Sequence, residues 1–202
     1  TGLHPFIITL GTQAIFRGAT LIVSNSSAVF GFPASFTKSI SASVLGIPVI
    51  AIVAIIVALI LAFLTIKTKL GRNIYALGGN KESAWYSGIN VKLHTLIVFI
   101  ISGLCAGIAG IVLLGRVGSA EPAAATGFET YAIAAAIIGG TSFFGGKGKI
   151  HGVVVGGLII GVINYGMNIL SLSSTLQQVV MGALIIGSVA LDRFVGSKNT
   201  SK

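Results

Sequence analysis

Residues 47–66 read IPVIAIVAIIVALILAFLTI, a run of twenty residues in which no side chain is charged. A helix of about 20 apolar residues is long enough to cross the hydrocarbon core of a bilayer, which is about 30 Å thick. The run therefore predicts a transmembrane helix. Five further apolar runs predict helices of the same kind, at residues 5–23, 95–117, 131–140, 153–170 and 176–191.

The composition of the whole chain also indicates a membrane protein. Of its 202 residues, 54% are hydrophobic and only 8% are charged, whereas about 25% are charged in a typical soluble domain. So few charged groups cannot cover the surface of a soluble globule, which excludes soluble enzymes, and the apolar runs exclude disordered and fibrous chains. The predicted fold class is all-α, a polytopic membrane helix bundle of about six spans.

We interpret residues 1–202 as a single transmembrane domain. The chain begins with Thr1 rather than Met and continues directly into an apolar run. We therefore expect it to be part of a longer protein, in which further spans come before Thr1.

The positions of the basic residues predict the orientation of the spans. Thirteen Lys and Arg residues oppose four acidic residues, for a net charge of +9, and cytoplasmic loops of membrane proteins accumulate Lys and Arg. If residues 131–146 cross the membrane, all the basic clusters face the cytoplasm. A short or re-entrant segment at 131–146 is the alternative. The clusters are residues 67–94, the pair Lys147 and Lys149, and the tail with Arg193, Lys198 and Lys202.

These basic clusters point to lipid headgroups rather than to nucleic acid. The aromatic residues that stack on bases are not interleaved with them, so nucleic acid is not an expected partner. Lysines at the ends of membrane helices interact with lipid headgroups, and membrane lipid is the partner that we expect for Lys147 and Lys149.

Small residues recur in the spans at a spacing that suits helix packing. Glycines lie four residues apart in three places, and this spacing lets two helix backbones approach closely in lipid. The pattern indicates a closely packed bundle and carries no information on function. The three pairs are Gly103 with Gly107, Gly152 with Gly156, and Gly157 with Gly161.

The predicted cytoplasmic loop, residues 67–94, is the most informative stretch. Asn80 is a favourable N-cap, Glu82 in the first turn complements the helix dipole, and Gly88 suits the C-terminal end of a helix. They predict a helix of about two turns over residues 81–87. It presents Ala84, Trp85 and Tyr86. Such a helix suits docking into a groove of a partner protein, but it would suit a position on the lipid headgroups equally well.

Three groups of residues carry a resemblance to a known family. In the loop they are Gly71-Arg72, Tyr75-Ala76-Leu77-Gly78-Gly79-Asn80, Ala84 and Ser87-Gly88-Ile89. Upstream they are Pro5-Phe6-Ile7 and Arg17-Gly18, and downstream Gly127-Phe128-Glu129, Ile138-Gly139-Gly140-Thr141-Ser142 and Gly145-Gly146-Lys147-Gly148. In these residues the chain resembles the carboxy-terminal two-thirds of permeases of ATP-binding cassette (ABC) importers, in the ribose, xylose and galactose class. It departs from the family at Trp85, where arginine is frequent.

The resemblance implies a multi-pass permease subunit of the bacterial cytoplasmic membrane. Such a subunit imports a monosaccharide, a pentose or a hexose, and the ATP is hydrolysed by a separate subunit. The implied partners are a cytoplasmic ABC ATPase, a periplasmic or extracellular sugar-binding protein, and a second permease copy in a homodimer. The loop 67–94 becomes the coupling loop, whose implied ATPase-coupling residues are Gly71, Arg72, Asn80, Lys81, Glu82, Ala84, Trp85, Tyr86 and Gly88.

Polar residues within the last spans are candidates for a substrate pathway. Asn164 and Asn168 lie four residues apart and therefore share one face of a helix, with Tyr165 beside them. Amide and hydroxyl groups can form hydrogen bonds with a sugar. The alternative role of these side chains is an interhelical hydrogen bond, which contributes about 0.6 kcal/mol in lipid.

Charged residues within the spans are few. Arg17 lies in the first run, so its side chain must face protein or water rather than lipid. We include Arg17 and Glu129 among the substrate-pathway candidates, and Arg17 could pair with Glu129 or with Glu121. Ion-coupled secondary transporters need titratable groups inside the membrane, and here Glu129 is the nearest to a span. This scarcity counts against an ion-coupled transporter, which is the first alternative function; a truncated, non-transporting membrane scaffold is the second.

No motif for covalent chemistry is present. The run Gly140-x4-Gly145-Gly146-Lys147 differs from a phosphate-binding loop by one extra glycine, and no Ser or Thr follows the lysine. One Cys and three widely separated His residues form no metal-ligand spacing. We therefore expect no catalytic residue, no metal and no cofactor bound by this chain.

Overall fold

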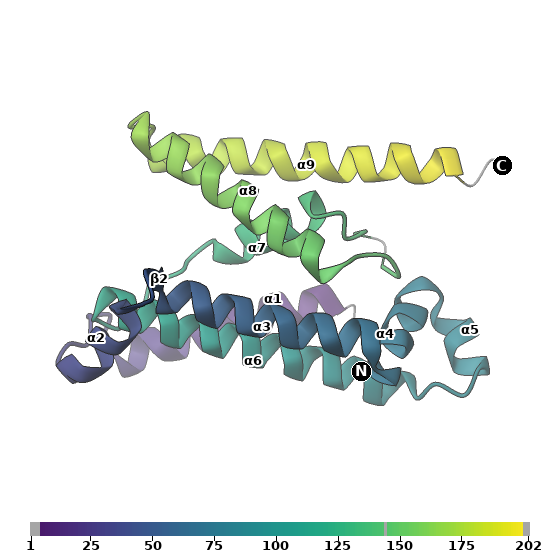
Figure 1. Cartoon of the computed structure of the whole chain (residues 1–202), viewed down its shortest axis with the longest axis horizontal. Helices are drawn as coiled ribbons and strands as arrows, with labels where there is room; N and C mark the ends of the chain where they lie inside the picture. Colours follow the sequence, from purple (N-terminus) through teal and green to yellow (C-terminus); the bar gives the residue numbers. More distant parts are fainter. Residues whose placement is uncertain (1–4, 144, 200–202) are drawn as a thin grey trace. The chain divides into compact units, whose positions relative to one another are not determined.

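The computed structural model describes residues 5–143 and 145–199, and side chains within 7–143 and 145–190. Each of the six predicted apolar runs forms a helix (Figure 1). The side chains of Arg193 and Lys198, and Lys202 altogether, lie outside the described parts, so the predicted basic tail is not described. The six helices are α1 (Pro5–Val23), α3 (Val49–Lys67), α6 (Val91–Val117), α7 (Phe128–Ile138), α8 (Ile150–Ile169) and α9 (Ser174–Asn199).

Three of these helices are long and apolar enough to cross a membrane: α3, α6 and α8. The helix α7 has 11 residues and is therefore about 16 Å long at 1.5 Å per residue. That length agrees with a short segment at 131–146, the alternative given above, since a complete crossing needs about 20 helical residues. The all-α, polytopic fold class is confirmed.

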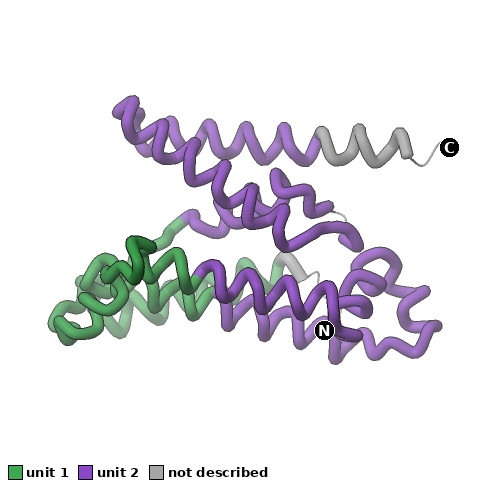
Figure 2. Tube along the Cα trace, in the orientation of Figure 1, with its two compact units in different colours: residues 1–53, 106–126 green, residues 54–105, 127–202 purple. Residues whose placement is uncertain are grey.

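The chain divides into two compact units, drawn in two colours in Figure 2. Unit 1 consists of residues 1–53 and 106–126, and unit 2 of residues 54–105 and 127–202. The division falls within the helices α3 and α6, each of which is continuous. The two units are described separately below.

In unit 1, two connections between the long helices are ordered by backbone contacts that the sequence analysis did not predict. The helix α2 (Ala34–Ser41) precedes a hairpin of two short antiparallel strands, β1 (Ser43–Val44) and β2 (Ile47–Pro48). The two turn residues, Leu45 and Gly46, both have positive φ, at 53° and 81°, the geometry of a two-residue hairpin turn. A pair of backbone hydrogen bonds of 2.9 Å joins Val29 to Ala120.

In unit 2, α7 packs against α8 and α9 around a small apolar core. Ala134, Ala135, Ile160 and Met181 are its buried members. The two helices α7 and α8 touch backbone to backbone. A Cβ atom added at Gly156 would lie 2.0 Å from the carbonyl oxygen of Ala135, so only glycine allows this approach.

Candidate functional site

The loop 67–94, to which the resemblance assigns the coupling role, lies in unit 2 and contains the helix predicted between Asn80 and Gly88. This helix is α5 (Lys81–Tyr86), with Glu82 in its first turn. The backbone N–H of Ser83 donates to the Oδ1 atom of Asn80 over 2.9 Å, so Asn80 is the N-cap. The predicted helix and its N-cap are therefore both confirmed.

Both hydrogen bonds of a Schellman motif close the other end of α5. The N–H of Ile89 donates to the carbonyl of Ala84 over 3.1 Å, and the N–H of Gly88 donates to that of Trp85 over 2.9 Å. Gly88 has a φ of 80°, which glycine adopts without strain. Ala84 is buried beneath this end. The helix is therefore held at both ends by hydrogen bonds with the residues that flank it.

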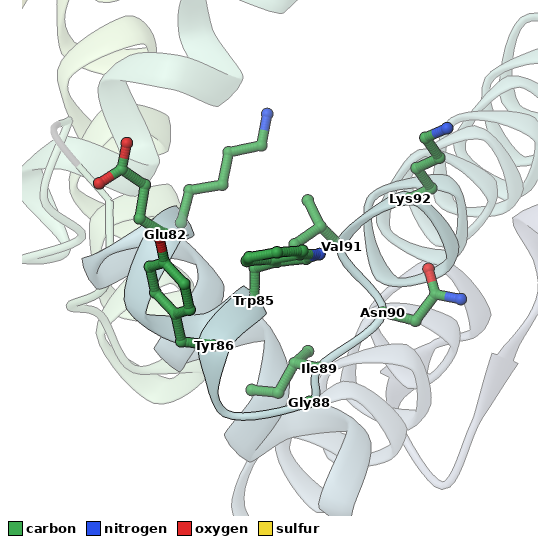
Figure 3. Close-up of a pocket in the computed structure, with 9 residues that line it drawn as sticks. Glu82, Trp85, Tyr86, Gly88, Ile89, Asn90, Val91 and Lys92 are labelled. Atoms are coloured by element: carbon green, nitrogen blue, oxygen red, sulfur yellow. The ribbon is translucent and has the colours of Figure 1, made fainter.

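The exposed side of α5 carries two aromatic side chains. Trp85 and Tyr86 are 63% and 80% exposed, and their rings are in edge contact, with centroids 5.0 Å apart. Figure 3 shows the Trp85 ring at the centre of a groove, with Tyr86 and Glu82 on one side and Lys92 on the other. The groove has a volume of about 750 Å³. Its exposed aromatic centre and charged rim suit both predicted positions of the helix, against a partner protein or on the lipid headgroups.

The coupling loop also contains a second helix, which the sequence analysis did not predict. The helix α4 (Lys69–Gly79) begins at the N-cap Thr68, whose side chain accepts a hydrogen bond from the N–H of Gly71. The spacing of Leu70, Ile74 and Leu77 has the helical period, and together with Thr68 it was the available signal. Of the residues that the resemblance implied for coupling, Gly71 is buried on α4 and Arg72 is exposed there.

Helix α4 is bound to its surroundings by hydrogen bonds of two side chains. The hydroxyl of Tyr75 donates to the carbonyl of Gly148 over 2.9 Å. The side-chain amide of Asn73 lies 3.0 Å from Nε2 of His94, while Nδ1 of His94 lies 2.8 Å from the carbonyl of Asn90. Because a carbonyl only accepts, Nδ1 carries a proton, and in the neutral ring Nε2 accepts from Asn73.

Three of the substrate-pathway candidates lie together on α8. Asn164 is half-buried, whereas Tyr165 and Asn168 are exposed. The side-chain amide of Gln177 on α9 donates to Oδ1 of Asn168 over 3.0 Å, and also to the carbonyl of Leu172. For Asn168 this contact supports the role of an interhelical hydrogen bond.

The two charged candidates lie in different units. Glu129, in the first turn of α7, belongs to unit 2. Arg17 belongs to α1 of unit 1, where its guanidinium donates to the hydroxyl of Thr126. That hydroxyl donates in turn to the carbonyl of Ala123 over 2.6 Å. The pairing of Arg17 with Glu129 or Glu121, and the assignment of these residues to a pathway, stay predictions.

Three apolar helices of spanning length, with shorter apolar helices beside them in the sequence, define a multi-pass membrane protein. The chain belongs to the family described as "Branched-chain amino acid transport system / permease component", whose model matches residues 1–189. This membership confirms the resemblance to ABC permeases and the multi-pass membrane localisation.

Three curated relatives of the chain carry the names of sugar permeases. The chain is 67% identical to the D-allose transport system permease protein AlsC of Escherichia coli K12, over 96% of this chain and 60% of the relative. It is 42% identical to the ribose import permease protein RbsC of Bacillus subtilis, over 95% and 60%. It is 38% identical to the L-arabinose transport system permease protein AraH of E. coli K12, over 95% and 58%.

The chain thus spans about three-fifths of the length of these relatives. No solved structure matches it.

Proposed function

We propose that this chain forms the larger part of a permease subunit that imports a monosaccharide across the bacterial cytoplasmic membrane. The single observation that carries the proposal is its 67% identity, along almost its whole length, to a D-allose permease. Ribose and arabinose permeases follow at about 40% identity. D-Allose is accordingly the first substrate to test, with the two pentoses next.

In this proposal the chain performs no covalent chemistry and binds no cofactor. ATP is hydrolysed by a cytoplasmic ABC ATPase, and the sugar is delivered by an external binding protein. A second permease copy completes the membrane part, and lipid surrounds it. The exposed aromatic pair on α5 supports this assignment, because a rigid capped helix with Trp85 and Tyr86 at its surface can transmit a push from a docked partner.

The proposed mechanism is alternating access. When two ATPase subunits close on ATP, they displace the helix α5 through the groove of about 750 Å³ around Trp85. The helix bundle then converts that displacement into a rigid-body movement. A rigid coupling helix is needed for this step, since a helix that frayed under load would absorb the movement instead of passing it on.

Uptake by the complete permease, reconstituted with its ATPase and binding protein in vesicles, tests the proposal. We expect ATP-dependent uptake of one sugar from a panel of D-allose, D-ribose and L-arabinose, unaffected by ionophores that remove proton and sodium gradients. Uptake that needs a gradient and no ATP would establish an ion-coupled transporter. A complete complex that moves no sugar and shows no sugar-stimulated ATPase activity would favour the scaffold.

A substitution in α5 tests the docking role separately. Gly88→Pro cannot adopt a φ of 80°, so it opens the Schellman motif and we expect it to abolish sugar-stimulated ATPase activity. Gly88→Asn is the matched control, because asparagine tolerates positive φ. Unchanged coupling in the proline variant would refute the docking role of α5.

Labelling of single cysteines tests the orientation. Ser83 and Lys147 are exposed, and after replacement of Cys105 by Ala we expect Ser83→Cys and Lys147→Cys to react only from the cytoplasmic side. Reaction of Lys147→Cys from outside would show that residues 131–146 are re-entrant.

A further inference from the structure

Helix α4 contacts three other parts of unit 2 at successive positions along its length. At its start, a Cβ atom added at Gly71 would lie 2.2 Å from the carbonyl oxygen of Thr65 on α3. In its middle, Asn73 is hydrogen-bonded to His94 on α6. At its end, Tyr75 and Gly78 contact the connection between α7 and α8. The helix therefore links α3 and α6 to α7 and α8.

The contact at the end of α4 is made by backbone atoms. A Cβ atom added at Gly78 would lie 2.6 Å from the backbone nitrogen of Gly146, and one added at Gly145 would lie 2.6 Å from the carbonyl oxygen of Gly78. Gly145 and Gly146 have φ values of 91° and 72°, a conformation that other residues rarely adopt. These are the glycines that give the sequence its incomplete likeness to a phosphate loop, and the structure shows them in contact with α4.

Helix α4 is in turn fixed to the coupling helix α5. A single residue, Asn80, separates the two helices and caps both: its N–H donates to the carbonyl of Ala76 over 3.1 Å, and its Oδ1 accepts from the N–H of Ser83. With no further residue between them, a displacement of α5 acts directly on the end of α4.

We propose that the contact of Tyr75 and Gly78 with Gly145, Gly146 and Gly148, here named the α4 joint, transmits the displacement of α5 to α7 and α8. The inference rests on the proposed function and adds the path by which a movement of the loop reaches the membrane helices. Backbone atoms in direct contact have no flexible side chain between them, so a displacement on one side is passed to the other with little loss.

A pair of neighbouring glycines provides the test. Gly78→Ala places a methyl group against the backbone of Gly146, whereas a Cβ atom added at Gly79 would meet nothing within 4 Å in the described parts of the chain. Both variants are made in the complete permease and assembled with its ATPase and binding protein. The measurements are basal ATPase activity, the amount of ATPase that copurifies, and the number of sugar molecules moved per ATP.

We expect Gly78→Ala to lower the ratio of sugar moved to ATP hydrolysed by about two- to thirty-fold, the range of coupling changes seen for residues that link two sites. Basal activity and copurification stay as in the wild type, and Gly79→Ala keeps the wild-type ratio. A merely structural defect would lower the amount of complex and leave the ratio unchanged, so the ratio separates coupling from folding.

Tyr75→Phe carries the test if Gly78→Ala fails to accumulate. It removes only the hydroxyl that donates to Gly148, and we expect a loss of coupling in the same direction and of smaller size. Wild-type ratios in every variant that assembles would overturn the α4 joint and leave the proposed function standing. A wild-type complex without ATP-driven uptake would overturn the proposed function, and the joint with it.

Discussion

Two faces of α8 carry glycine pairs of identical spacing, and within the described residues one pair lies against the backbone of another segment whereas the other pair does not. A Cβ atom added at Gly152 would lie 2.1 Å from the carbonyl oxygen of Gly139, and one added at Gly156 would lie 2.0 Å from that of Ala135. Added at Gly157 or Gly161, it would meet nothing within 4 Å in the described parts of the chain.

The difference shows that the spacing of small residues permits close packing without determining it. What separates the two pairs is the face on which each lies. Gly156, Ile160 and Met167 are all buried on α8, and they follow one another at helical spacing along a single face. Gly157 follows Gly156 and Gly161 follows Ile160, so both lie about 100° around the helix from the buried face. Neighbouring side chains on that side, such as Leu158 and Val162, are exposed. Such a face can meet lipid or another chain.

The largest effect is expected when a bulky side chain is added on the packed face of α8. We expect Gly156→Leu to destabilise the permease by about 3 kcal/mol or more, since the new side chain meets the backbone of α7, which cannot rotate away as a side chain can. The measurement is the free energy of unfolding of the complete permease in mixed micelles of denaturing and mild detergent.

Gly157→Leu is the matched control on the open face. It adds the same side chain to the neighbouring residue, and we expect a change within about 0.5 kcal/mol, as for substitutions away from close contacts. Equal losses in the two variants would show that the open face is covered in the complete protein, and they would contradict the contrast between the two faces.

A glycine of unit 1 tests whether a clash with a side chain destabilises the protein less than a clash with the backbone. A Cβ atom added at Gly115 on α6 would lie 2.5 Å from Cγ1 of Ile40 on α2. This obstacle is a side chain, so we expect Gly115→Ala to cost about 1 to 2 kcal/mol, less than Gly156→Leu.

A double-mutant cycle checks that assignment. Ile40→Gly removes Cβ as well as both γ carbons, the three atoms that the added Cβ would meet. We expect the double variant to lose less stability than the two single losses added together, by at least about 0.5 kcal/mol. Gly110→Ala, where nothing lies within 4 Å in the described residues, is the control on the same helix. Additive losses would show that the contact between α2 and α6 does not cause the effect.

The elements that the sequence predicted are those determined by local patterns. The first apolar run, residues 5–23, coincides with α1 (Pro5–Val23), because lipid selects for hydropathy and length alone. The helix α5 was predicted together with both of its ends, since Asn80 and Gly88 act on neighbouring backbone groups.

The elements that were not predicted depend on contacts between distant residues. The helix α4 is held by partners at positions 65, 94 and 146–148, and no local pattern reveals these partners. The same holds for the candidate site. The spacing of Asn164 and Asn168 placed them on one helix, as expected, but only the fold shows that Asn168 is bonded to Gln177.

Removal of that hydrogen bond is expected to change the free energy of unfolding least. It sets a polar contact of α8 beside the glycine contacts of the same helix. Asn168→Ala removes the acceptor of Gln177, which keeps its second bond to the carbonyl of Leu172. We expect a loss of about 0.6 kcal/mol in the free energy of unfolding and an unchanged KM for sugar uptake. Gln177→Ala removes the same bond from the other side, so the double variant should cost less than the two single losses together. A raised KM in Asn168→Ala with unchanged stability would instead place this side chain on the substrate pathway, the role that we still predict for Asn164, whose replacement by alanine should raise KM.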